Sequence, residues 1–292
     1  MTLMIILICL IAERFLLEKV HLRNNRWLLR YSEWLQHQKL PAWLERGIVG
    51  IALLLLPPLL AIGILQHIFD EGLLGISLSI VILLYCLGPE DLDTQISQYT
   101  EAVDDGDEAN INAVASTIIM DEPPISEPAR SQAVAEGVLL QANQNLFAVL
   151  FWFIVLGPLG AMIYRLTTWL PALVQSNRDI DFQLSSKQLT VILDWIPARI
   201  TAFCYAIAGS FEDALYGWRS FQEGRFSEFN DSNSGTLICT GSGAMRLSTL
   251  LDEANEGNQL YSTLPQSAMA LVWRSLVVFL VILTLLTMTG II

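Results

Sequence analysis

Residues 268–292 read AMALVWRSLVVFLVILTLLTMTGII, a run of apolar residues that one charge, Arg274, interrupts. About 20 predominantly apolar residues are enough for a helix to cross the hydrocarbon core of a bilayer. This segment therefore predicts a membrane-spanning helix, and it decides the class of protein. The composition agrees, because 53% of the 292 residues are hydrophobic and 15% are charged, whereas soluble domains carry about 25% charged residues.

Further apolar runs precede this one. Residues 48–69 and 73–87 are separated by three residues only, which predicts an antiparallel hairpin, and Pro57-Pro58 should kink its first helix because two backbone donors are missing. The remaining runs lie at residues 1–17, 146–173 and 189–209. We expect an all-α, polytopic membrane protein with four to six transmembrane helices and helical or irregular cytoplasmic loops.

Basic residues near the N-terminus predict the orientation of the chain. Residues 14–46 contain seven Lys or Arg against three Asp or Glu, and no Lys or Arg precedes Arg14. A cleaved signal peptide carries its positive charge before the apolar region, so this is expected to be an uncleaved anchor. The positive-inside rule then predicts an N-terminus in the periplasm, residues 18–47 in the cytoplasm, and a multi-pass arrangement.

The predicted organisation has seven segments. In chain order they are an N-terminal membrane anchor (1–20), a basic interfacial helix (21–47), a transmembrane hairpin (48–88), an acidic cytoplasmic loop (89–145), a membrane region (146–209), a second cytoplasmic loop (210–267) and a C-terminal transmembrane helix (268–292). Residues 146–209 either cross the membrane twice or form re-entrant helices.

The charged residues are concentrated in these segments. The formal net charge is −13, and residues 88–145 hold twelve acidic residues against one basic residue. This stretch predicts a solvated, partly flexible region, or else a contact for a basic partner protein. Arg23, Arg26 and Arg30 share a helical face near Trp27 and Trp34, which suits a helix at the lipid headgroups. The lipid bilayer is thus a partner, and nucleic acid is excluded by the missing basic surface.

No cofactor or metal is expected from the residue pattern. The four cysteines, Cys9, Cys86, Cys204 and Cys239, lack paired spacing and predict buried thiols. The three histidines form no ligand cluster, and Gly241-Ser-Gly243 is not followed by the Gly-Lys-Ser/Thr of a phosphate-binding loop. A small-solute transporter is disfavoured, because the chain has no detectable inverted repeat.

Three segments carry a resemblance to a known family. They are Phe151-Trp152 with the Gly157–Arg165 stretch GPLGAMIYR, the Asp194–Ala202 stretch DWIPARITA, and Ser232–Gly235 followed by GAMRL at Gly243–Leu247. In order and spacing they resemble the motifs FW…GGxPGAxxYR, NWIPARLTA and SPNAG…GAL of the CobD/CbiB family of cobalamin biosynthesis. Residues 146–209 are accordingly identified as a CobD/CbiB-like membrane region.

The chain also resembles AmpE, a divergent branch of this superfamily, in length, in its opening residues and in residues 193–199. That resemblance implies a non-catalytic regulatory or signalling protein of the bacterial inner membrane, linked to β-lactamase induction, antibiotic resistance and cell-wall stress. It would sense a cell-wall-derived or other anionic small ligand, or contact a protein partner through its acidic cytoplasmic loops.

Departures from the enzyme branch favour the regulatory interpretation. Positions where that branch carries carboxylates hold Leu140, Gln144, Thr190, Val191 and Ile238, and Gln141 stands where it carries Asn. Magnesium-dependent chemistry needs carboxylates. We therefore lean against an enzyme. The alternative is an ATP-dependent ligase of the cobinamide-phosphate synthase type, which joins an amino-alcohol phosphate to a corrinoid carboxylate.

The retained polar and glycine residues are the candidate ligand-binding residues, and none is assigned a catalytic role. They are Arg165, Asp194, Trp195, Arg199, Asn233, Gly235 and Gly243. Ionisable residues in membrane segments usually have a partner or a function. Under the functional interpretation the arginines and residues 232–243 face one anion site. Under the structural one, Asp194 pairs with Arg199 or Arg165 reaches the headgroups, and Gly157 and Gly160 serve helix packing.

Overall fold

The protein is described by a computed structural model that covers residues 2–16, 26–37, 47–69, 72–173, 180–222, 231–256 and 261–289. Within these ranges every regular element is a helix and no strand occurs. The chain divides into two compact units. Unit 1 comprises residues 1–87 and 148–194, and unit 2 comprises residues 88–147 and 195–292. The all-α prediction is confirmed.

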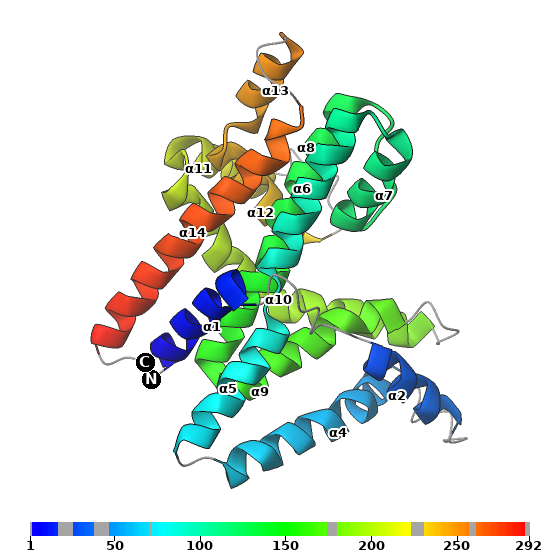
Figure 1. Ribbon diagram of the computed structural model, residues 1–292, viewed down its shortest axis with the longest axis vertical. Helices are drawn as coiled ribbons and strands as arrows, with labels where there is room; N and C mark the ends of the chain where they lie inside the picture. The colour runs from blue at the N-terminus through cyan, green and yellow to red at the C-terminus, as the bar shows by residue number, and fades with distance from the viewer. Residues whose placement is uncertain are drawn as a thin grey trace. The chain divides into compact units, whose positions relative to one another are not determined.

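Unit 1 is built around the long helix α9 (Ala148–Leu173), which packs against α4 (Gly47–Ile68) and α5 (Leu73–Cys86) (Figure 1). The N-terminal helix α1 (Thr2–Leu16) packs on α5 and α9. Its Cys9 thiol lies 3.7 Å from the carbonyl oxygen of Ile80. The unit also contains α2 (Arg26–His37) and the first part of α10 (Ile180–Ala208).

A glycine breaks the regularity of α9. Gly157 has φ 68° and ψ −157°, a conformation that only glycine adopts readily because a Cβ would be strained there. Pro158 follows it and lacks a backbone donor, so the helix bends between its two halves instead of running straight. The sequence motif around Gly157 therefore shapes the helix.

Among the described residues, four helices are long and apolar enough to cross a membrane: Gly47–Ile68, the continuous stretch Glu127–Pro171, Ile180–Ala208 and Thr263–Met288. Two shorter apolar helices lie at Thr2–Glu13 and Leu74–Cys86. These elements fall within the predicted range of four to six, and the protein is a multi-pass membrane protein. Helix α4 includes Pro57 and Pro58, and the kink expected there remains a prediction.

The outer faces of these helices suit lipid. On α4, the side chains of Leu56, Leu60 and Ile64 are exposed at a spacing of four residues. On α14 (Thr263–Met288), Val277 and Val281 repeat the pattern. Residues four apart lie on one face of a helix, so each helix presents an apolar stripe to the bilayer.

Unit 2 holds the remaining helices. They are α6 (Pro89–Asp105), α7 (Glu108–Ile119), α8 (Glu127–Ala142), the π-helical turn η1 (Asn143–Phe147), the end of α10, α11 (Phe211–Gln222), α12 (Ser232–Ala244), α13 (Leu247–Asn255) and α14. Helix α14 lies along α8 and α6, and α12 packs on α11, α8 and α13 (Figure 1). Most of α12 is buried, so it forms the centre of this unit.

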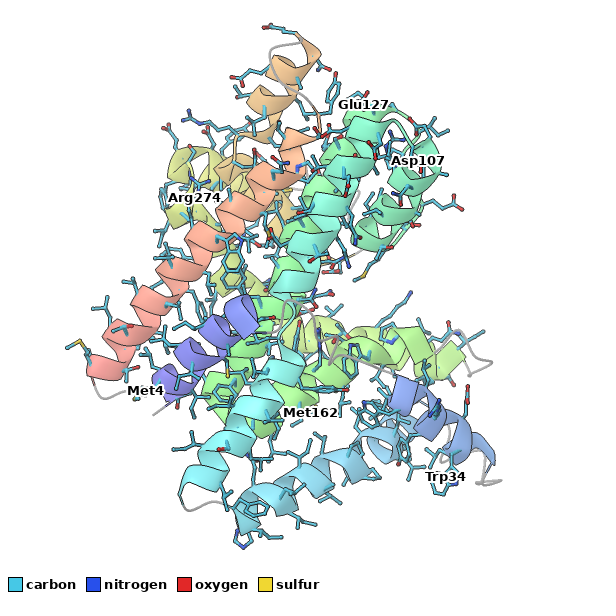
Figure 2. The ribbon with its side chains drawn as sticks, viewed as in Figure 1. Met4, Trp34, Asp107, Glu127, Met162 and Arg274 are labelled. Atoms are coloured by element: carbon cyan, nitrogen blue, oxygen red, sulfur yellow. The ribbon has the colours of Figure 1, made fainter. Side chains whose placement is uncertain are left out.

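The acidic residues 89–145, assigned above to a cytoplasmic loop, fold as three helices. Leu92, Ile96 and Tyr99 are buried along one face of α6, while Asp93, Glu101, Asp104 and Asp105 are exposed. Asp107 caps α7 by accepting hydrogen bonds from two backbone amides, and Arg130 of α8 forms a 3.0 Å ion pair with Glu108. Figure 2 shows Asp107 and Glu127 near the starts of α7 and α8.

Of the predicted interfacial helix 21–47, the structure describes Arg26–His37 and Gly47, and the rest lies outside the described residues. Trp27 and Trp34 are exposed, and the Tyr31 and Trp34 rings stack with centroids 6.2 Å apart. Contact of this helix with headgroups remains a prediction. All four cysteines are free and buried, as predicted.

Candidate functional site

The motif residues are distributed over both units. Arg165 and Asp194 belong to unit 1, whereas Trp195, Arg199 and residues 232–247 belong to unit 2. Each group is described by its own contacts.

In unit 1 the motifs of α9 and α10 are joined by two hydrogen bonds. The Tyr164 hydroxyl donates to the Asp194 carboxylate at 2.5 Å, and Trp152 Nε1 donates to the Leu193 carbonyl at 3.2 Å. Tyr164 is fully buried and Asp194 is 7% exposed. A buried carboxylate needs such donors because burial otherwise disfavours the charged form.

Arg165 is also buried, and its guanidinium lies 5.4 Å from the centroid of the Trp169 ring. The adjacent Tyr85 ring meets Trp169 edge to face at 5.8 Å. The face of an indole ring attracts a cation, and the attraction is strongest where water is excluded. The charge of Arg165 is therefore placed beside an aromatic pair inside unit 1.

In unit 2, Arg199 is held in a defined orientation. Its Nη1 donates to the carbonyl oxygen of Trp195 at 2.7 Å and to Asn233 Oδ1 at 3.2 Å. The guanidinium also lies 4.1 Å from the centroid of the exposed Trp195 ring. Within the described residues, neither Nε nor Nη2 of Arg199 makes a hydrogen bond, so these donors face no protein acceptor there.

Asn233 is positioned by the cap of α12. Asp231 Oδ1 accepts from the backbone amides of Asn233 at 2.6 Å and Ser234 at 2.9 Å, which satisfies the first donors of the helix. Ser234 Oγ donates to the second carboxylate oxygen at 2.6 Å. This cap brings Asn233, from a motif 34 residues away, to Arg199.

The two candidate glycines serve close packing. A Cβ on Gly235 would overlap the Phe221 ring, and one on Gly243 would overlap the carbonyl oxygen of Asp213. Both clashes involve α11, so these glycines allow α11 and α12 to approach closely. No ligand contact needs to be invoked for them.

Positions that carry carboxylates in the enzyme branch do not fit magnesium in this chain. Gln141, which stands where that branch carries Asn, has a structural role: its amide nitrogen donates to the carbonyls of Thr117 and Ile118, at 3.1 and 2.8 Å, and so links α8 to α7. Ile238 and Val191 offer no oxygen ligand. Across the described ranges, no group of three or more His, Cys, Asp or Glu side chains is arranged to hold a metal ion.

Sequence analysis missed a polar group beside α12. Asp213 accepts hydrogen bonds from Ser210 Oγ at 2.6 Å and from Arg246 Nε at 2.7 Å. The Ser210 hydroxyl and then the Arg246 guanidinium lower the pKa of the Asp213 carboxyl below its ordinary value. Arg246 stands inside the third motif, three residues after Gly243, and this was the available signal.

Comparison with known proteins gives a consistent family assignment. The sequence profile described as CobD/Cbib protein matches residues 6–287. "Cobalamin biosynthesis protein CobD" of Chromobacterium violaceum is 30% identical over 213 residues, which is 71% of this chain and 66% of that protein. The protein of the same name from Stutzerimonas stutzeri is 30% identical over 207 residues, 70% of this chain and 66% of its own length. No solved structure matches.

These relatives correct the functional prediction. The chain spans about two thirds of the length of the curated relatives it matches. Their names refer to cobalamin biosynthesis, so the regulatory, AmpE-type role in β-lactamase induction is wrong, and the alternative is favoured. The wrong inference was that a chain without these carboxylates no longer takes part in cobalamin biosynthesis. The match also extends well beyond residues 146–247, where the motifs lie.

Proposed function

Since the chain belongs to the CobD/Cbib protein family, we propose that it works in cobalamin biosynthesis, where it joins an amino-alcohol phosphate to a carboxylate of a corrinoid. The observation that carries this proposal is the profile match over residues 6–287. The two relatives at 30% identity, both named for cobalamin biosynthesis, support it.

The reaction class sets what a site must do. An amine nitrogen bonds to the carboxyl carbon and a carboxyl oxygen leaves, which requires ATP to activate that oxygen. Because the described residues do not fit magnesium at the positions of the enzyme branch, no step is assigned to a metal. Both organic substrates are anionic, so cationic side chains are needed to hold them.

Arg199 is the residue to which we assign substrate binding. Its Nη1 is fixed by Trp195 and Asn233, while Nε and Nη2 are available within the described part of the chain. A guanidinium with two parallel donors matches a carboxylate or phosphate in geometry as well as charge. Asn233 acts as a positioning residue, because it orients Arg199.

The proposal places the protein in the bacterial inner membrane with a periplasmic N-terminus. The seven basic residues within 14–46 support that orientation, since cytoplasmic segments are enriched in Lys and Arg. An epitope tag at the N-terminus should be cleaved by protease added to the periplasmic side of intact spheroplasts. Cleavage only in inverted vesicles would reverse the orientation.

Complementation tests the proposed pathway. A bacterial strain that lacks its own CobD protein should regain corrinoid synthesis when this chain is expressed. Purified protein with ATP, a corrinoid acid and an amino-alcohol phosphate should form the amide, detected by mass spectrometry. Protein that inserts into the membrane but supports neither readout would contradict the proposal.

Variants test the role of Arg199. Arg199→Ala should lower amide formation by about a hundredfold, and Arg199→Lys should recover only part of it, because a lysine lacks the planar pair of donors. The exposed Arg219 of α11 provides the matched control, and Arg219→Ala should leave the rate unchanged. Equal effects at the two positions would remove Arg199 from the binding site.

A further inference from the structure

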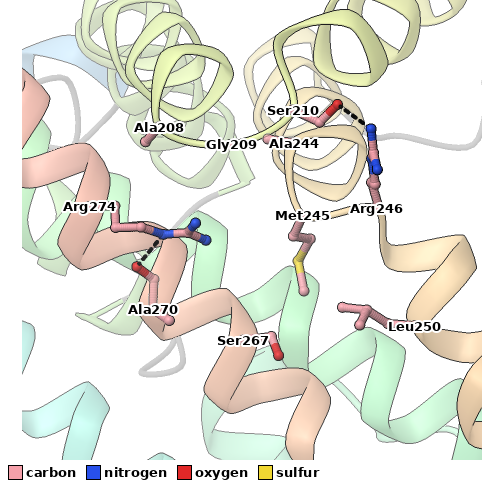
Figure 3. Close-up of a pocket in the computed structure, with 10 residues that line it drawn as sticks. All are labelled: Ala208, Gly209, Ser210, Ala244, Met245, Arg246, Leu250, Ser267, Ala270 and Arg274. Carbon is pink, nitrogen blue, oxygen red and sulfur yellow. Dashed lines mark hydrogen bonds between the residues drawn. The ribbon is translucent and has the colours of Figure 1, made fainter.

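A pocket of about 420 Å³ lies in unit 2, apart from the Arg199 cluster. It is bounded by the end of α10, the end of α12, the start of α13 and one face of α14 (Figure 3). Its polar lining includes Ser210, Arg246, Ser267 and Arg274. Nothing above assigns this pocket a role.

Two arginines line the pocket from different helices, and the Arg246 guanidinium is turned toward Ser210 and Asp213. Figure 3 shows Arg274 reaching in from α14, and Arg246 beside Ser210 at the start of α13. Arg246 pairs with Asp213, and its Nη2 lies 3.4 Å from Ser210 Oγ. Arg274 Nε donates to the carbonyl of Ala270 at 3.3 Å, and among the described residues it has no ion pair. One carboxylate against two guanidiniums leaves a net positive charge.

The backbone at Arg246 is unusual. Its φ of 54° and ψ of 49° are left-handed, a conformation that residues with a side chain rarely adopt. Strained residues of this kind concentrate at ligand sites, where surrounding structure holds them. Arg246 also occupies the N-cap of α13 without supplying a side-chain acceptor, so the positive end of that helix begins at the pocket without a capping anion.

The rest of the lining is apolar. Met245 and Leu250 face the same space as the two arginines. The pocket therefore pairs a cationic side with an apolar wall, which suits an organic molecule that carries a phosphate. The lining residues include no carboxylate, so a cation would find no counter-charge there.

Arg274 also stands at the edge of an apolar surface. The exposed stripe of α14 starts three residues later, at Val277, and continues through Val281 and Leu285. Basic side chains at the ends of membrane helices reach the level of lipid phosphates. A phosphate in this pocket can thus come from a lipid headgroup or from a free ligand.

We propose that this pocket is a phosphate-binding site, in which Arg274 holds a phosphate group, Arg246 adds positive charge to the lining, and Met245 and Leu250 contact the organic part attached to the phosphate. The site stands independently of the proposed pathway, because the charges and shape of the pocket carry it and its test needs no corrinoid.

The test measures binding to full-length protein purified in detergent. Inorganic phosphate and glycerol 3-phosphate are titrated at constant ionic strength set by chloride, and phosphatidylglycerol retained after delipidation is measured by mass spectrometry. Arg274→Gln removes the charge at an exposed position and should weaken phosphate binding about tenfold. The exposed Arg219→Gln is the matched control and should bind like the parent protein.

A variant that is expected to bind phosphate more tightly shows that weaker binding in the other variants is not caused by misfolding. Asp213→Asn removes the carboxylate that competes for Arg246, so it should tighten phosphate binding about threefold. A misfolded protein would not bind more tightly. Arg246→Gln should weaken binding as Arg274→Gln does.

The outcomes separate the two sources of phosphate. Binding of the soluble probes that is lost in Arg274→Gln supports a free ligand. Phosphatidylglycerol retained by the parent protein but not by Arg274→Gln, with no soluble binding, supports a lipid headgroup. Absence of both, or equal binding by Arg274→Gln and Arg219→Gln, overturns the proposal.

Discussion

The hydroxyl of Tyr164 donates a hydrogen bond of 2.5 Å to the carboxylate of Asp194, and this bond joins α9 to α10 inside unit 1. The two residues are 30 positions apart in the chain, and each belongs to one of the family motifs. Both side chains are buried. The pair therefore accounts for two polar positions within the motifs through structure, without any ligand.

Tyr164→Phe tests how much the Tyr164–Asp194 hydrogen bond contributes to the stability of the folded protein. The variant deprives the buried Asp194 carboxylate of a donor, and loss of such a bond typically costs about 1–3 kcal/mol of the free energy of unfolding. The measurement is denaturant unfolding in detergent. Tyr216→Phe is the control, because that tyrosine is exposed on α11. Equal stability of the two variants would show that the bond contributes little.

Gly243→Ala tests the close approach of α11 and α12. The added Cβ would overlap the carbonyl oxygen of Asp213, so one helix must shift, and overpacking of this kind costs about 1–3 kcal/mol of stability. The nearest atom to a Cβ on Gly63 lies 3.9 Å away, at the Leu159 side chain. Gly63→Ala should therefore unfold at the parent temperature or above it. Similar losses at both glycines would argue against a packing role for Gly243.

The Asp213–Arg246 pair predicts a pH dependence. Because the folded protein lowers the pKa of Asp213 below its ordinary value of 3.8, the ionised form is favoured in the folded state. Its contribution is present above pH 3.8 and is lost as the pH falls through the lowered folded value. The parent protein should unfold at higher urea concentration than Asp213→Asn at pH 5–7, and this difference should shrink progressively as the pH falls below 3.8. A difference in unfolding concentration that does not change with pH would contradict a stabilising role of the Asp213–Arg246 ion pair.

Cys239 predicts slow thiol chemistry. Burial, followed by the nearby Glu136 carboxylate, raises the pKa of this thiol to about 11, so little thiolate forms at pH 8. All four native cysteines are buried, and N-ethylmaleimide should label the folded protein slowly and the denatured protein fully. Ser248→Cys, at an exposed position of α13, should add one rapidly labelled site. Rapid labelling of the parent protein would place a native cysteine at the surface.

Sequence patterns predicted the membrane helices well where apolar residues are continuous. The run 48–69 became α4 (Gly47–Ile68), and the run 268–292 corresponds to α14 (Thr263–Met288). Helix α10 starts at Ile180, nine residues before the apolar run at 189, because its first turns are amphipathic. Apolar length alone cannot detect such turns, since only one face of them is buried.

In the acidic segment 88–145, the number of charged residues is a poor predictor of the local structure. Residues 88–145 carry twelve acidic side chains, which suggested a solvated and partly flexible stretch. Yet Ile111, Ala115 and Ile118 are buried along one face of α7. A spacing of three and four residues predicts an amphipathic helix whatever the net charge, and that periodicity was the better signal.

By itself, the sequence determined the membrane class, the helical content and the family motifs, because these depend on composition and on short-range order along the chain. Only the tertiary structure decided which side chains meet, such as Tyr164 with Asp194 and Arg199 with Asn233, and that Arg246 and Arg274 line one pocket. These partners lie about 30 residues apart, on different helices. Their contacts follow from how the helices pack, and helix packing is set by the fit of whole faces, which no local pattern specifies.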